Sequence, residues 1–224
     1  MLTIGHRGAK GHYPENTLIS FEKALAIGAH GIEFDVHLSV DDEVIVIHDE
    51  TVNRTSNGIG KVKELTSTQI RQFTIDHKHQ IPTLSEVLDL AKDTLINIEL
   101  KVGETVKPVI EIIERYISEK GYRYEQFLIS SFDWVALQQV RDLHPEIPIG
   151  VLTETDLELA VGFATSIKAE TIHPHYHLLT KENTEKIQQL GFKVFTWTVN
   201  EPEDIRLVKS FSVNGIITDF PERI

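Results

Sequence analysis

The chain has 224 residues, enough for one sizeable hydrophobic core and within the usual range of a single α/β barrel. It contains no cysteine, which excludes disulfides and thiolate metal sites, and no apolar run is long enough to span a membrane. The net charge of −12 argues against nucleic-acid binding and against stable association with anionic membranes, so a site for an anionic molecule must supply its own positive charge.

Short β-rich segments alternate with helical patterns along the whole chain. Strands are expected near residues 2–5, 31–38, 44–48, 95–100, 127–130, 148–151, 170–173, 193–198 and 214–218. Helices are expected near residues 16–27, 84–92, 105–119, 133–143, 156–166, 180–190 and 201–210. Several of these helices have start signals, among them Thr83, Asp133, Asp156 and Thr180.

The order of the elements favours a TIM barrel. Without the 44–48 hairpin return, eight strands remain, and the helices between them predict parallel pairing with right-handed crossovers. Eight strands close a TIM barrel, although an open doubly wound sheet fits the same pattern. Residues 51–82 are too long for a plain loop, and we expect a small insertion above the barrel mouth, with a short helix at 66–73, that forms part of the pocket wall. Residues 1–224 are expected to form one barrel domain.

The most informative segment of the chain is 31–49. Glu33 and Asp35 lie two apart on a strand, so both side chains point to one face. If Asp41 and Asp42 form a two-residue hairpin loop, the returning strand brings His48 opposite Asp35. Two carboxylates and an imidazole at one spot indicate a divalent-metal site beside a proton-transfer residue.

A third carboxylate comes from the next barrel strand. Asn97, Glu99 and Lys101 alternate with apolar residues and share a face, which in a closed barrel points inward. An interior Glu99–Lys101 ion pair is one interpretation, since buried charges need partners. We favour a metal site in which Glu99 joins the two carboxylates of the preceding strand, because three such groups suit Mg²⁺ or Ca²⁺.

Other strand ends add further candidates. His6-Arg7-Gly8 follows the first strand, at the face where barrel active sites lie. His6 and His48 are the histidines near the carboxylates, and we assign both to acid–base catalysis. Asn16 opens the first helix as a candidate N-cap, and its nearness to this tripeptide makes it a candidate site residue. Trp197, at the end of the seventh strand, is either core packing or an aromatic wall of the mouth, and its position favours the wall.

Taken in order, these motifs resemble the glycerophosphodiester phosphodiesterase family. The resemblance runs from residue 4 to about residue 221 and rests on an ordered set of motifs. The motifs are His6-Arg7-Gly8, Pro14-Glu15-Asn16-Thr17, Glu33-Phe34-Asp35-Val36, His48-Asp49, Glu99-Leu100-Lys101 and Trp197-Thr198-Val199-Asn200. One departure is Asp41-Asp42 in the hairpin turn, where many members have Asp-Gly.

The resemblance implies a TIM barrel with a small insertion after the second strand. It also implies metal-dependent hydrolysis of glycerophosphodiesters, such as glycerophosphocholine or glycerophosphoethanolamine, to glycerol 3-phosphate and an alcohol. The family's metal ligands fall on Glu33, Asp35 and Glu99, and its acid–base histidines on His6 and His48. Its phosphate-binding cations fall on Arg7 and Lys101.

Competing interpretations remain open at this point. A lysophospholipase D or a phosphoinositide-cleaving lipase could use the same barrel, but the polar composition of 51–82 favours a soluble head-group diester. A Mg²⁺-dependent lyase or isomerase and a sugar-phosphate binding protein are more distant alternatives. No signal sequence is recognisable at the start of the chain, and we expect a cytoplasmic location. The expected partner is a small phosphodiester, and a homodimer is left open.

Overall fold

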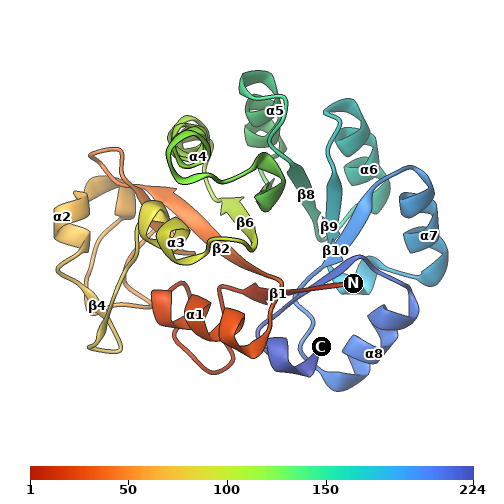
Figure 1. Cartoon of the computed structure of the whole chain (residues 1–224), viewed down its shortest axis with the longest axis horizontal. Coiled ribbons are helices and arrows are strands. Elements are labelled where there is room, and N and C mark those ends of the chain that lie inside the picture. Colours follow the sequence, from red (N-terminus) through yellow and green to blue (C-terminus); the bar gives the residue numbers. More distant parts are fainter.

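The computed structural model describes all residues from 1 to 224 and contains a closed barrel of eight parallel strands (Figure 1). The barrel strands are β1 (Leu2–His6), β2 (Gly31–Leu38), β6 (Leu95–Leu100), β7 (Phe127–Ser131), β8 (Ile149–Thr153), β9 (Thr171–Pro174), β10 (Lys193–Thr196) and β11 (Gly215–Thr218). β1 pairs with both β11 and β2, which closes the barrel. The TIM-barrel prediction is therefore confirmed, and the open sheet is excluded.

Seven α-helices alternate with these strands and surround the barrel (Figure 1). They are α1 (Leu18–Ile27), α3 (Leu84–Leu90), α4 (Val106–Lys120), α5 (Trp134–Leu143), α6 (Leu157–Ser166), α7 (Lys181–Gln189) and α8 (Pro202–Ser210). After β11 the chain makes only a 3-10 turn, η5 (Pro221–Arg223). The helix starts follow the predicted signals, since Thr83, Asp133, Asp156 and Thr180 each accept a backbone hydrogen bond as N-caps.

The alternation of side chains along each strand separates two apolar layers. On β2, for example, Ile32 and Phe34 are fully buried in a cluster of 43 residues between barrel and helices. The opposite face of the strands points into the barrel, where Ile4, Leu128, Phe195 and Ile217 form a small apolar cluster. Polar side chains then occupy the carboxyl ends of the strands, where a barrel keeps its functional residues.

The β2–β3 hairpin corrects one prediction. β3 (Val44–Val46) is antiparallel to β2, as expected, but Ser39 pairs with Glu43 and leaves a three-residue loop that ends at Asp42 in a left-handed conformation (φ 61°). The Ser39 hydroxyl accepts a hydrogen bond from the Glu43 backbone N–H, which stabilises this longer loop. Asp35 therefore lies opposite Ile47, whose N–H donates to its carbonyl, and His48 follows one residue later.

Residues 51–82 form an insertion to one side of the barrel, beyond α1 and α3 (Figure 1). It contains η1 (Val62–Glu64), α2 (Ser67–Ile70) and a two-stranded ribbon of β4 (Thr74–Ile75) and β5 (His79–Gln80). The helix is shorter than the predicted 66–73, and the ribbon was not predicted because each strand is only two residues long. A cluster of seven buried apolar residues holds the insertion against the hairpin. No helix of the molecule is both long and apolar enough to cross a membrane.

Candidate active site

Three carboxylates meet at the carboxyl ends of β2 and β6. The parallel register places Glu33 beside Asn97 and Asp35 beside Glu99, so all point to the barrel interior. One oxygen of Glu33, one of Asp35 and one of Glu99 lie within 4.8 Å of one another. The sequence predicted this cluster because side-chain alternation and parallel pairing together decide which residues meet.

The electrostatics of this cluster favour a bound cation. Burial raises the pKa of Glu33 well above its usual value, and the neighbouring carboxylates add to the shift. Burial and the Asp35 charge raise the pKa of Glu99 to about 7. Burial would also raise the pKa of Asp35, but the charges of Arg7 and Lys101 outweigh it and hold that pKa below its usual value. Glu33 Oε1 is buried without a hydrogen-bond partner, so this donor set fits a hard divalent ion.

Arg7 adopts an uncommon backbone conformation beside the cluster. Its φ of 49° is left-handed, and its N–H donates to Glu33 Oε2 at 3.0 Å. Its Nε lies 3.2 Å from Asp35 Oδ2, and its Nη1 donates to Glu15 Oε1 at 2.9 Å. Gly8 follows with a φ of 85°, and a Cβ there would lie 2.4 Å from the Ser20 hydroxyl oxygen. The tripeptide His6-Arg7-Gly8 thus makes a tight turn that only a glycine at its third position allows.

His6 is backed by a carboxylate that directly follows the last strand of the barrel. Its Nδ1 donates to Asp219 Oδ1 at 2.6 Å, and Asn200 Nδ2 donates to the other oxygen of Asp219 at 2.9 Å. Burial lowers the pKa of His6, and the hydrogen bond to Asp219 offsets only part of this effect. With Nδ1 occupied, Nε2 is the nitrogen of His6 that is free for proton transfer.

His48 has the same arrangement at the end of the hairpin. Its Nδ1 donates to Asp49 Oδ1 at 2.7 Å, and its Nε2 lies 3.4 Å from Lys101 Nζ. Lys101 also donates to Glu99 Oε1 at 2.7 Å and lies 3.6 Å from Asp35 Oδ1. The Glu99–Lys101 ion pair, the alternative weighed for these two residues, therefore forms within the carboxylate cluster.

The prediction that Asn16 is a helix N-cap is wrong. Thr17 caps α1, since its hydroxyl accepts from the Ser20 N–H. Asn16 is instead buried, with a φ of 55°, and its Nδ2 donates to Asp35 Oδ2 at 3.0 Å. Asn16 therefore contacts the carboxylate cluster.

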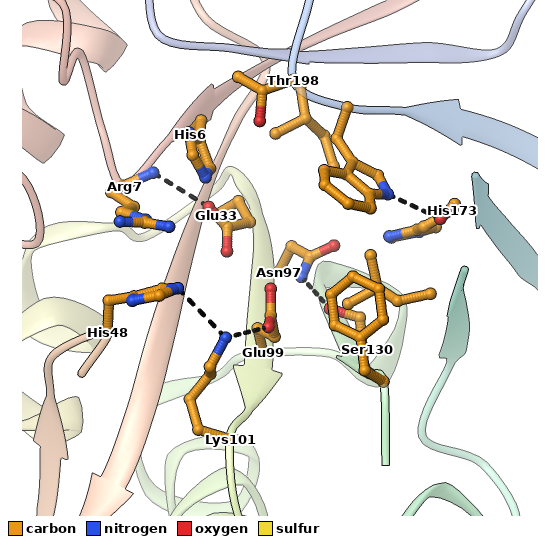
Figure 2. A pocket seen from close by; sticks show the side chains of 14 residues that line it. His6, Arg7, Glu33, His48, Asn97, Glu99, Lys101, Ser130, His173 and Thr198 are labelled. Atoms are coloured by element: carbon orange, nitrogen blue, oxygen red, sulfur yellow. Dashed lines mark hydrogen bonds and ion pairs between the residues drawn. The ribbon is translucent and has the colours of Figure 1, made fainter. Parts of the chain in front are cut away.

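Trp197 stands in the wall of the pocket that contains these groups. Its Nε1 donates to the carbonyl of His173 at 2.8 Å, and Phe132 packs edge-on against its ring at 5.4 Å. In Figure 2, Glu33 and Glu99 lie between His6, Arg7 and His48 on one side and His173 on the other. The pocket is lined by His6, Arg7, Glu33, His48, Asn97, Glu99, Lys101, Ser130, Phe132, Leu152, His173, Trp197, Thr198 and Ile217.

The insertion contributes none of these lining residues, so the prediction that 51–82 forms part of the pocket wall is wrong. Its apolar residues pack on the outside of the hairpin instead, which keeps the insertion beside the mouth. Sequence reasoning also missed Asp219 and Asp49 as partners of the two histidines. Asp49 directly follows His48, and Asp219 directly follows a strand, and these positions were the available signals.

Comparison with known proteins gives consistent matches. A sequence profile of the Glycerophosphoryl diester phosphodiesterase family matches residues 6–223. A glycerophosphodiester phosphodiesterase of Caldanaerobacter subterraneus subsp. tengcongensis is 40% identical, over 100% of this chain and 96% of that protein. A crystal structure of glycerophosphodiester phosphodiesterase from Thermotoga maritima is 32% identical, with a TM-score of 0.85 over 99% of this chain and 96% of that one.

A third match is an Oleispira antarctica phosphodiesterase whose structure was solved in complex with the product sn-glycerol-3-phosphate. It is 25% identical, with a TM-score of 0.91 over 100% of this chain and 95% of that one. Fold and matches together define a phosphoric diester hydrolase on a TIM barrel. The chain belongs to the glycerophosphodiester phosphodiesterase family, as the resemblance of its motifs implied.

Proposed function

We propose that residues 1–224 act as one catalytic domain that hydrolyses glycerophosphodiesters such as glycerophosphocholine or glycerophosphoethanolamine. The products are glycerol 3-phosphate and the free alcohol. The observation that carries this proposal is the cluster of three carboxylates, of which Glu33 and Glu99 line a pocket together with two carboxylate-backed histidines. The glycerol 3-phosphate held by the Oleispira antarctica relative supports the choice of product.

In this proposal Glu33, Asp35 and Glu99 hold one divalent cation, Mg²⁺ or Ca²⁺. The fit rests on the unpartnered Glu33 oxygen and on the raised pKa of Glu33 and Glu99, which a cation would relieve. When bound, such an ion neutralises phosphoryl charge and orients the diester. A site made of carboxylates alone favours these two ions over zinc.

Arg7 and Lys101 are proposed to bind the phosphoryl oxygens. Both line the pocket, and both contact Asp35, so their charges already face the carboxylate cluster. A guanidinium and an ammonium beside the phosphate suit a diester anion, since charge-assisted hydrogen bonds are the strong ones. They also supply the local positive charge that a protein of net charge −12 needs to bind an anion.

His6 and His48 are proposed to share the proton transfers. One histidine takes the proton of the nucleophile, which is water or the 2-hydroxyl of glycerol, as its oxygen bonds to phosphorus. If the 2-hydroxyl attacks, a cyclic phosphate forms, and a water molecule then adds to phosphorus and opens the ring to give glycerol 3-phosphate, with the two histidines exchanging roles. The other gives a proton to the alcohol oxygen as the bond between phosphorus and that oxygen breaks. Asp219 and Asp49 stabilise the imidazolium forms. Asn16 and Trp197 are proposed as further substrate contacts near the carboxylates and in the pocket wall.

The test is release of glycerol 3-phosphate from glycerophosphocholine by the purified protein, with EDTA, Mg²⁺ and Ca²⁺ in parallel. We expect release with at least one of the two ions and loss of release in EDTA. A folded protein that releases no glycerol 3-phosphate under any of these conditions would contradict the proposal. If release in EDTA were equal to release with added Mg²⁺ or Ca²⁺, the proposed role of the metal would be contradicted, but the proposed reaction would not.

A further inference from the structure

Arg54 lies near the start of the insertion and contacts the active site without lining its pocket. Its guanidinium donates twice to Asp49, from Nε to Oδ2 at 2.7 Å and from Nη2 to Oδ1 at 2.9 Å. It also donates twice to Glu15, from Nη1 to Oε2 at 3.1 Å and from Nη2 to Oε1 at 2.8 Å. Four of the five N–H groups of one side chain therefore bind two carboxylates.

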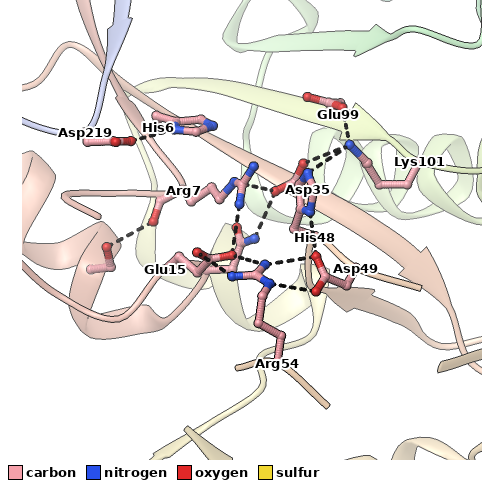
Figure 3. A network of polar contacts seen from close by, with 12 residues as sticks. His6, Arg7, Glu15, Asp35, His48, Asp49, Arg54, Glu99, Lys101 and Asp219 are labelled. Atoms are coloured by element: carbon pink, nitrogen blue, oxygen red, sulfur yellow. Dashed lines mark hydrogen bonds and ion pairs between the residues drawn. The ribbon is translucent and has the colours of Figure 1, made fainter. Parts of the chain in front are cut away.

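These two carboxylates each hold a residue of the proposed machinery (Figure 3). Asp49 accepts from Nδ1 of His48, and Glu15 accepts from Nη1 of Arg7. A continuous chain of charge-assisted hydrogen bonds thus runs from His48 through Asp49, Arg54 and Glu15 to Arg7. Arg54 is its central member and its only contribution from the insertion.

The charges of Glu15 and Asp49 explain why this series of hydrogen bonds depends on Arg54. Glu15 and Asp49 are both negative and both contact the same guanidinium, so without Arg54 they would repel each other. Hydrogen bonds from Arg54 hold the pKa of Asp49 far below its usual value, and they help to overcome the burial that would raise the pKa of Glu15. Losing Arg54 would free Asp49 to turn toward water and would leave His48 without a fixed partner.

The backbone around Arg54 is well anchored. Val52 is fully buried, its N–H donates to the Gly60 carbonyl, and Thr51 and Lys61 form a β-bridge. Asn53 closes the same loop, since its Oδ1 accepts from the Gly60 N–H at 2.9 Å. Arg54 therefore extends from a fixed backbone, which a residue needs if it is to hold other side chains in place.

We propose that Arg54 is a positioning residue through which the insertion orients His48 and Arg7 for phosphodiester hydrolysis. This inference rests on the proposed function. Residues that orient a metal ligand from behind typically change metal affinity or activity by about 10- to 100-fold when they are replaced, and we expect the same range for Arg54. Because Arg54 acts through Asp49 on one side and through Glu15 on the other, its loss should lower kcat through His48 and raise KM through Arg7.

The experiment measures kcat and KM for glycerophosphocholine, with Mg²⁺ and with Ca²⁺ in parallel, in the parent protein and in R54A, R54K, D49N and the double variant R54A/D49N. We expect R54A to lower kcat by about 10- to 100-fold. R54K should recover only part of this loss, because an ammonium supplies the charge without the fork that grips both carboxylates. In the D49N background R54A should lower kcat little further, because both changes release the same histidine, while its effect on KM through Glu15 should remain.

Arg71 supplies the matched control. It also lies in the insertion, donates at 2.8 and 2.9 Å to the two oxygens of Glu86, and is about as exposed as Arg54. R71A should keep the kcat and KM of the parent protein. The inference is overturned if R54A loses no more activity than R71A, or if the effects of R54A and D49N on kcat simply multiply. A folded parent protein without any turnover would refute the proposed function, and this inference with it.

Discussion

The two histidines at the barrel mouth are held in different ways. His6 and Asp219 come from β1 and the end of β11, and their side chains are only 14% and 16% exposed. His48 and Asp49 follow the hairpin strand, are 32% and 28% exposed, and depend on Arg54 of the insertion. Burial at the ends of barrel strands fixes the His6–Asp219 pair, whereas ion pairing to Arg54 of the insertion fixes the His48–Asp49 pair. An insertion can therefore serve an active site without lining its pocket.

The first prediction removes each histidine in turn. His6→Ala and His48→Ala should each lower kcat by about 10²- to 10⁴-fold, because each removes one proton transfer. Release of glycerol 3-phosphate measures the effect, and thermal unfolding shows whether the variants stay folded. Near-normal activity in both variants would contradict the two-histidine mechanism. A large loss in only one of them would show that the two pairs differ in role as well as in construction.

The second prediction concerns the carboxylates between the two histidines. Saturating Mg²⁺ or Ca²⁺ should raise the Tm of the parent protein, and Glu99→Gln should remove most of this rise. An ion at 100 times its Kd adds about 2.7 kcal/mol to the free energy of unfolding. Because burial raises the pKa of Glu99 to about 7, protons compete with the ion, so the rise in Tm should grow from pH 6 to pH 8.

The control for this measurement is Glu111→Gln, since Glu111 is an exposed partner of Lys107 on α4. It should leave the effect of the ion unchanged. An equal rise in Tm for Glu99→Gln and the parent protein would show that the ion binds elsewhere.

The third prediction compares the two backing carboxylates directly. Asp219→Asn should lower the free energy of unfolding by about 1–3 kcal/mol, because an amide offers one acceptor oxygen where the half-buried donors of His6 and Asn200 each need one. Asp49→Asn should cost less than about 1 kcal/mol, because its ion pairs are more exposed. Urea denaturation measures both values. A larger loss of stability for Asp49→Asn than for Asp219→Asn would contradict the view that burial fixes the His6–Asp219 pair more firmly than ion pairing fixes the His48–Asp49 pair.

The fourth prediction examines burial on the barrel side of the pocket. His173 is fully buried, and burial lowers its pKa to about 3. Below pH 6.5 the unfolded chain binds a proton at this residue that the folded protein does not bind. The free energy of unfolding should therefore fall, by about 1.4 kcal/mol per pH unit from this residue. The His173→Gln variant cannot bind this proton. As the pH falls from 7 to 5, the difference in free energy of unfolding between the variant and the parent protein should therefore become smaller. If the free energies of unfolding of the parent protein and of His173→Gln changed equally with pH, His173 would not be buried in its neutral form.

Much of the barrel and its carboxylate cluster could be predicted from sequence. Strand positions follow from short β-rich runs between helical patterns, and parallel pairing then fixes which strand ends meet. Glu33, Asp35 and Glu99 came together for that reason, since their strands are neighbours and their side chains share a face.

The contacts between distant segments could not be predicted in the same way. Asp219 reaches His6 across 213 positions of sequence, only because the last strand closes against the first. Arg54 reaches two carboxylates because of how the insertion folds back on the hairpin, which composition does not reveal. The predicted hairpin register differs from the observed one by one residue, because the Ser39 hydroxyl stabilises a longer loop.

The most direct test of the account is a ³¹P NMR time course of glycerophosphocholine with the parent protein, with Mg²⁺ and Ca²⁺ in separate runs and with His48→Ala in parallel. The account predicts that the diester signal is replaced by the monoester signal of glycerol 3-phosphate with the parent protein and persists with the variant. Formation of phosphocholine and glycerol, or a diester signal that stays unchanged with the folded parent protein and either ion, would contradict it.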